Sequence, residues 1–146
     1  MNTRSGTTDS PTHRADPEPF RARSVEVSLT VKDLERSLTW YQKVVGFTVS
    51  QRFEREGKLM AVSLAAGDVR MLIGQDDGAK GWDRAKGEGF SLQLTTDQSI
   101  DKIATRITER GGTLDSQPAD MPWGVRMFRL RDPDGFKLTI SSVRAV

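Results

Sequence analysis

The sequence carries one pattern twice, at an almost constant offset. In each copy a short strand precedes a helix, and three strands follow the helix. Three pairs of landmarks set the offset: Asp33 and Asp97 (64 positions apart), Gly46 and Gly111 (65), and Gly67 and Gly135 (68). Repetition of one supersecondary unit predicts an α+β fold built from two βαβββ modules, residues 24–75 and 89–143.

The first module begins with Val25–Val31, where apolar and polar residues alternate as in a half-buried strand. Asp33 is a good N-cap for the following helix, and Gly46 is a natural stop. The apolar positions of this helix share one face: Leu34, Leu38, Tyr41 and Val45. Three more strands are expected at 47–53, 59–64 and 69–73.

The second module follows a Gly-, Asp- and Lys-rich loop (about 75–88) that contains Trp82. We expect a strand at 90–95, a helix capped by Asp97 or Ser99, and a short strand at 113–116. A hairpin then joins strands 125–130 and 136–140, because Asp132-Pro-Asp-Gly135 is a dense turn signal.

Composition excludes several classes of function. The chain has no cysteine, and its only histidine, His13, lies in a polar segment with three prolines. We interpret residues 1–22 as a disordered or loosely attached tail and 23–146 as a single domain. The domain therefore has no Ser-His-Asp or Cys-His set. No apolar run is long enough to span a membrane. Basic and acidic residues are interspersed along the chain, and the net charge is only +2. We expect a cytoplasmic protein without nucleic-acid or membrane partners.

The repeat, the segment 30–47 and the sequence of the hairpin region at 122–135 together resemble the vicinal oxygen chelate superfamily. This superfamily contains glyoxalase I, bleomycin-resistance proteins and extradiol dioxygenases. The sequence of this hairpin region is most similar to that of metal-free antibiotic-binding members. The resemblance implies an open cupped sheet around a cavity, with the helices on the outer face, and a homodimer that in some members exchanges modules. The side chains expected under the helices are those of Val25, Val27, Leu29, Phe90, Leu92 and Leu94.

Metal-dependent members hold their ion with cup-facing side chains from the first and fourth strands of each module. The resemblance places Glu26, Met71, Ser91 and Thr139 at these positions. A slip of one residue would offer Arg70 or Leu72 in place of Met71. Only Glu26 is a credible ligand, and a divalent ion needs three or four suitable donors. We therefore expect neither a metal nor another cofactor.

The candidates for ligand binding are the remaining cup-facing, aromatic and strand methionine side chains: Glu26, Ser28, Met60, Met71, Ser91, Gln93, Trp123, Arg126 and Thr139. Glu26 is either a solvated or paired strand residue, or a cavity carboxylate able to bind a cation or act as a general base. Arg126 is either the partner of Glu26 or an anchor for a ligand carboxylate or phenolate. Trp123 either packs at a strand edge or stacks on a flat ligand.

The first functional hypothesis is a metal-free protein of the bleomycin-resistance type that sequesters an apolar or aromatic small molecule in a dimer cavity. The second is a metal-free isomerase, lyase or cyclase, in which Glu26 abstracts a proton and Arg126 steadies the oxyanion. The third is a glyoxalase-like metal-dependent enzyme.

Overall fold

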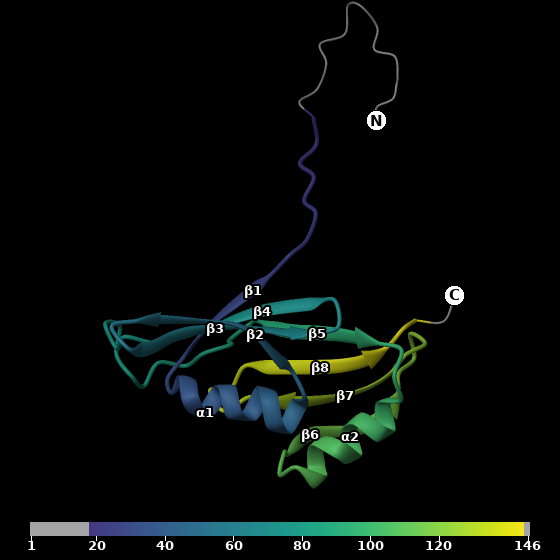
Figure 1. Ribbon diagram of the computed structural model, residues 1–146. Helices are drawn as coiled ribbons and strands as arrows, with labels where there is room; N and C mark the ends of the chain where they lie inside the picture. Colours follow the sequence, from purple (N-terminus) through teal and green to yellow (C-terminus); the bar gives the residue numbers. More distant parts are fainter. Residues whose placement is uncertain (1–17, 145–146) are drawn as a thin grey trace, which may run out of the picture.

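The computed structural model describes residues 18–144 (Figure 1). The first module contains β1 (Val27–Val31), α1 (Leu34–Thr39), η1 (Trp40–Val45), β2 (Thr48–Arg55), β3 (Lys58–Ala66) and β4 (Val69–Gln75). The second contains β5 (Ser91–Thr96), α2 (Ile100–Glu109), β6 (Leu114–Asp120), β7 (Arg126–Arg131) and β8 (Lys137–Ser142). The predicted α+β class and the duplicated βαβββ unit are confirmed.

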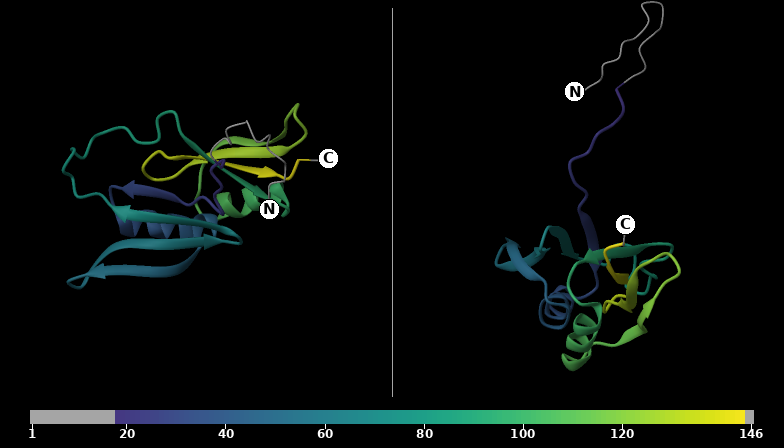
Figure 2. Two further views of the ribbon diagram at one scale, coloured as in Figure 1. Left: turned by 90° about the horizontal axis from the view of Figure 1, so that it is seen from above. Right: turned by 90° about the vertical axis from the view of Figure 1, so that its right-hand side faces the viewer.

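Each module forms one four-stranded sheet, and the two sheets have the same topology. Their strand orders are β1-β4-β3-β2 and β5-β8-β7-β6. The pairs β1–β4 and β5–β8 are parallel, and the other pairs are antiparallel. Both sheets are open rather than closed into a barrel, and β1 and β5 each lie at a sheet edge. Figure 2 shows the two sheets and the long connection between β4 and β5.

The first helix changes its winding halfway. Asp33 caps α1 by accepting a hydrogen bond from the backbone N–H of Arg36 at 3.2 Å. The chain then continues as a π-helix, η1, where the sequence predicted an uninterrupted α-helix. Gly46 ends it with φ +108°, a left-handed conformation that glycine adopts at little cost. In the second module Ser99, not Asp97, caps the helix.

The two modules share one hydrophobic core. Buried residues from α1, β3 and β4 form a single cluster with those from α2, β7 and β8, and α2 contacts η1 directly. Tyr41 lies fully buried in this cluster, with its ring edge-on to Trp40 and Phe47. The helices therefore cover the apolar face of each sheet, the side predicted as the outer face of the cup, and leave the opposite faces exposed.

Polar contacts also join the modules at the turn between β7 and β8. The Tyr41 hydroxyl donates to Asp132 Oδ2 at 2.7 Å, and Asp132 Oδ1 accepts from the backbone N–H groups of Asp134 and Phe136. Burial raises the pKa of Asp132, although these hydrogen bonds act in the opposite direction. The Asp-Pro-Asp-Gly turn thus connects the two strands and also docks on the helix of the other module.

A second polar connection runs through the loop between β4 and β5. Lys86 Nζ, on a nearly buried side chain, contacts Asp76 at 3.0 Å, Asp134 at 3.3 Å and the carbonyl oxygen of Thr30 at 2.8 Å. The backbone N–H of Gly78 and the side chains of Lys86 and Arg84 lower the pKa of Asp76. This loop therefore carries ion pairs that link it to both modules.

Some sequence predictions miss the element boundaries. Val25 precedes β1 and is 91% exposed, so the prediction that a helix covers it is wrong. Phe90 likewise precedes β5 and is 40% exposed. The strand predicted at 113–116 extends to Asp120. Most of the predicted tail, including His13, lies outside the described residues. Within residues 18–144, we find no helix with the length and apolar character needed to cross a membrane.

Candidate functional site

The exposed face of the second sheet carries a hollow of about 570 Å³. Strand register explains its lining, because side chains directly opposite one another on paired strands share a face. All four strands of this sheet and the segment before β5 contribute: Gly89, Phe90, Ser91, Gln93, Asp115, Ser116, Arg129, Leu130, Arg131, Lys137 and Thr139. A volume of this size falls in the range of small-molecule sites.

Three predicted ligand-binding residues meet in this hollow. Gln93 on β5 faces Thr139 on β8, and Ser91 lies two residues before Gln93 on the same face. Ser91 and Gln93 are exposed, whereas Thr139 is only 4% exposed and lies in the middle of the sheet. Their hydroxyl and amide groups can donate and accept hydrogen bonds to a ligand.

The sequence analysis missed the charged part of the hollow. Arg129 faces Thr139, and Arg131 faces Lys137, so three cations lie on the hollow's side of the β7–β8 hairpin. The signal was present in the hairpin pattern. The alternation that buries Phe128 and Leu130 turns Arg129 and Arg131 outward.

The predicted residues of the first module do not reach this hollow. Ser28 lies exposed on the open face of its own sheet, as expected. Glu26 is exposed and precedes β1 rather than lying on it. Met71 pairs with Val27 and is 1% exposed, so its predicted place on the cup-facing side is wrong. The one-residue slip considered for this strand is what the structure shows, since Leu72 pairs with Ser28.

Met60 and Trp123, two further predicted residues, and Trp82 of the β4–β5 loop also lie outside the hollow. Met60 is half-buried on β3, at an irregularity of the β2–β3 pairing, and its neighbour Leu59 is the residue that packs against the core. Trp123 lies in the turn between β6 and β7, where half of it is exposed, and it does not line the hollow. Trp82 lies against Gly78 in the β4–β5 loop, where a Cβ on Gly78 would be only 2.4 Å from the indole ring.

Arg126 has partners that the sequence did not predict. Its guanidinium donates twice to Asp101, at 2.9 and 3.0 Å, and once to Asp120, at 3.1 Å. These hydrogen bonds raise the pKa of Arg126, and the same contact lowers the pKa of Asp101. Arg126 therefore pairs with α2 and β6 rather than with Glu26.

The residues implied for a metal ion do not fit one. Met71 points into the core, Glu26 precedes its strand, and Ser91 and Thr139 offer only hydroxyl groups. Neutral hydroxyls and a buried thioether are a poor set for a first-row divalent ion. In the part of the chain that the structure describes, no three His, Cys, Asp or Glu residues gather closely enough to hold a metal.

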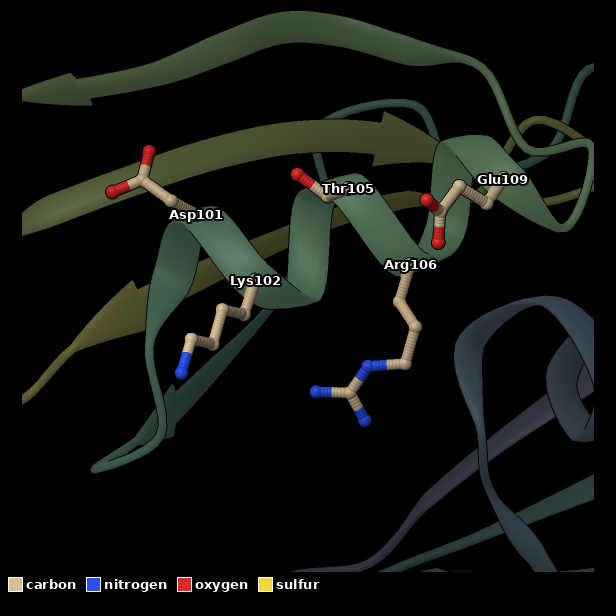
Figure 3. Close-up of a pocket in the computed structure, with 5 residues that line it drawn as sticks. All are labelled: Asp101, Lys102, Thr105, Arg106 and Glu109. Carbon is tan, nitrogen blue, oxygen red and sulfur yellow. The ribbon is translucent and has the colours of Figure 1, made fainter.

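A second depression, of about 370 Å³, follows the outer side of α2 (Figure 3). Asp101, Lys102, Thr105, Arg106 and Glu109 form it, all from one exposed helix face. Figure 3 shows Lys102 and Arg106 extending to one side of the helix and Asp101 and Thr105 to the other. Its mixed charges are those of a solvated helix surface.

Comparisons with known proteins agree with this architecture. The model of the Glyoxalase/Bleomycin resistance protein/Dioxygenase superfamily matches residues 23–140. No curated protein sequence matches significantly.

Several solved structures share the fold. TioX from Micromonospora sp. ML1 is 22% identical, with a TM-score of 0.64 over 85% of this chain and 98% of its own. TnmS3, an antibiotic binding protein from Streptomyces sp. CB03234, is 24% identical, with a TM-score of 0.64 over 84% and 98%. A glyoxalase/bleomycin resistance protein/dioxygenase from Nocardioides is 21% identical, with a TM-score of 0.65 over 87% of each chain.

Proposed function

Because this chain belongs to the glyoxalase/bleomycin resistance protein/dioxygenase superfamily, we propose that it is a metal-free protein that binds an aromatic small molecule. The hollow on the second sheet is the observation that carries the proposal, because it gathers Ser91, Gln93 and Thr139 on one open face. The fold likeness to TnmS3, described as antibiotic binding, supports the same class of function.

The proposal includes a homodimer, with or without exchanged modules. The hollow opens to solvent, and the edge strands β1 and β5 lack a neighbour on one side within the described chain. Unpaired strand edges and an uncovered polar face favour association with a second copy. In such a dimer, we expect a second copy to bring Ser28, exposed on β1 of its first sheet, to the ligand. Light scattering on the purified protein should give the mass of two chains, and a monomer at binding concentrations would contradict this part.

Sequestration has more support than catalysis. A proton-transfer reaction needs a base and an oxyanion stabiliser on one substrate. Glu26 is exposed before β1, and the guanidinium of Arg126 is held by Asp101 and Asp120. The two groups assigned to catalysis therefore lack a common site within this chain.

Equilibrium dialysis against a panel of flat aromatic natural products tests the proposal. We expect saturable binding of at least one compound at micromolar concentration, unchanged by a chelator and recovered intact afterwards. The Glu26→Gln variant should bind as the wild type does. Turnover of a bound compound, lost in Glu26→Gln, would replace the proposal by the enzymatic alternative.

A further inference from the structure

The hollow is organised as two polar rows that cross the second sheet. The first row contains Gln93, Thr139 and Arg129, and the second contains Ser91, Lys137 and Arg131. Neighbours within a row are about 5 Å apart, and the rows are about 7 Å apart, from ordinary sheet spacing. Each row thus presents hydrogen-bonding groups at one end and a cation at the other.

The charges of these rows do not cancel. The hollow has three cations and a single carboxylate, Asp115, which leaves a net charge of +2. Asp115 accepts a hydrogen bond from Arg131 Nε at 2.8 Å, so Arg131 is paired. Among residues 18–144, the structure gives no carboxylate within 4 Å of the charged groups of Arg129 or Lys137.

Other strand cations of the described chain, such as Arg52 and Arg70, also have no carboxylate within 4 Å, but the hollow gathers Arg129 and Lys137 together. Two cations that connect elements of the fold contrast with this, because each contacts two carboxylates. Lys86 contacts Asp76 and Asp134, and Arg126 contacts Asp101 and Asp120. A hollow with two unmatched cations concentrates positive potential, because its low-dielectric walls focus the field.

We propose that the hollow selects an aromatic ligand that carries an oxyanion, such as a carboxylate, a sulfonate or a phenolate. This inference rests on the proposed binding function and names its ligand class. The fork of Arg129 can donate two hydrogen bonds to the oxygen atoms of such a group, and Lys137 supplies a second positive charge. Gln93 and Thr139 donate further hydrogen bonds to the same oxygens.

The aromatic part of the ligand has its own contact. Phe90 lies at the rim of the hollow, immediately before β5, and keeps 40% of its surface exposed. An exposed ring beside a polar floor is suited to stack on a flat ligand. The arrangement therefore places the ligand's ring at the rim and its charge over the second sheet.

Two fluorescent probes with nearly the same skeleton test charge selection. One is 8-anilinonaphthalene-1-sulfonate, and the other is N-phenyl-1-naphthylamine, which lacks the sulfonate. We expect the wild-type protein to bind the sulfonate at least tenfold more tightly at low ionic strength. Added salt should weaken binding of the sulfonate and leave the neutral probe unchanged, because salt screens exposed charges.

Charge-removing variants locate the effect. Arg129→Gln and Lys137→Gln should each weaken sulfonate binding about fivefold, the size expected for an exposed ion pair, without affecting the neutral probe. Lys102→Gln is the matched control, since it removes the same charge from the outer side of α2. It should leave both probes unchanged. Thermal melting of each variant verifies that it is folded.

The possible outcomes distinguish the failure of oxyanion selection from the failure of small-molecule binding itself. Equal binding of both probes, or equal loss in Lys102→Gln and Arg129→Gln, would refute oxyanion selection while leaving a small-molecule site. Binding of neither probe, together with no ligand from the natural-product panel, would refute the binding function itself.

Discussion

The hydrogen bond between Tyr41 and Asp132 should contribute measurably to the stability of the whole domain. It joins the helix of the first module to the β7–β8 turn of the second, over 2.7 Å. Tyr41 is fully buried and Asp132 is 5% exposed, so water does not replace a lost partner. Tyr41→Phe removes only the hydroxyl and keeps the ring between Trp40 and Phe47.

The expected cost follows from the acceptor that is left behind. Asp132 Oδ1 keeps its two backbone donors, but Oδ2 loses its only donor among the described residues. An orphaned buried acceptor costs about 1–3 kcal/mol, and each kcal/mol lowers the melting temperature of a domain this size by about 4 °C. Tyr41→Phe should therefore melt about 4–12 °C below the wild type.

The pH dependence of this difference gives a second measurement. The Tyr41 hydrogen bond lowers the pKa of Asp132 against the burial that raises it, so the variant's carboxyl titrates at a higher pH than the wild type's. The folded variant therefore gains a proton first as pH falls. The stability difference should be largest near neutral pH and should shrink towards pH 4.

Urea unfolding at several pH values measures both effects, and a double-mutant cycle isolates the pair. In an Asp132→Asn background the carboxylate is replaced by a neutral amide, so Tyr41→Phe should cost less there than in the wild type. A loss below about 0.5 kcal/mol, or the same loss in both backgrounds, would refute the assignment of stability to this hydrogen bond.

Three further predictions follow from single positions. Gly112→Ala should destabilise the domain by about 1–3 kcal/mol in urea unfolding, because its Cβ would lie 2.5 Å from Ile107 Cγ2. The control Gly74→Ala, whose Cβ would meet nothing nearer than 3.9 Å, should not. Asp76→Asn should lower the melting temperature at pH 7. The difference from wild type should begin to shrink only as pH falls below about 4, the pKa of an unfolded Asp, and should disappear only when pH falls through the lowered pKa of the folded Asp76. Arg126→Gln should leave ligand affinity within twofold of wild type in dialysis, since its guanidinium lies on Asp101 rather than in the hollow.

The duplicated fold was predictable because its signals are local. Alternation, capping residues and turn glycines recur in both modules, and each element they indicate is present. The face of β4 was not predictable, because Met71 and Leu72 are adjacent apolar residues that fit either side. Only pairing with β1, which places Met71 beside Val27, decides between them.

The charged lining of the site was predictable in part. Thr139 was assigned to the open face, and strand alternation and hairpin pairing place Arg129 and Lys137 on that same face. The prediction missed both cations because it considered only the apolar residues of the hairpin. The partners of Arg126 were beyond local reasoning, because Asp101 lies 25 residues away on a helix.

The cations that connect elements of the fold differ from those of the candidate site in whether they have a carboxylate partner within the described chain. Charges that connect elements have their partners within the chain, as Lys86 has in Asp76 and Asp134. Arg129 and Lys137 connect nothing within the described chain, yet they lie on a rigid central hairpin whose other face is the buried core. Neither cation has to give up an ion pair within the described chain when an anion arrives, so its attraction is available for binding. The ligand's charge, rather than its apolar area alone, should therefore determine which aromatic molecules this hollow holds.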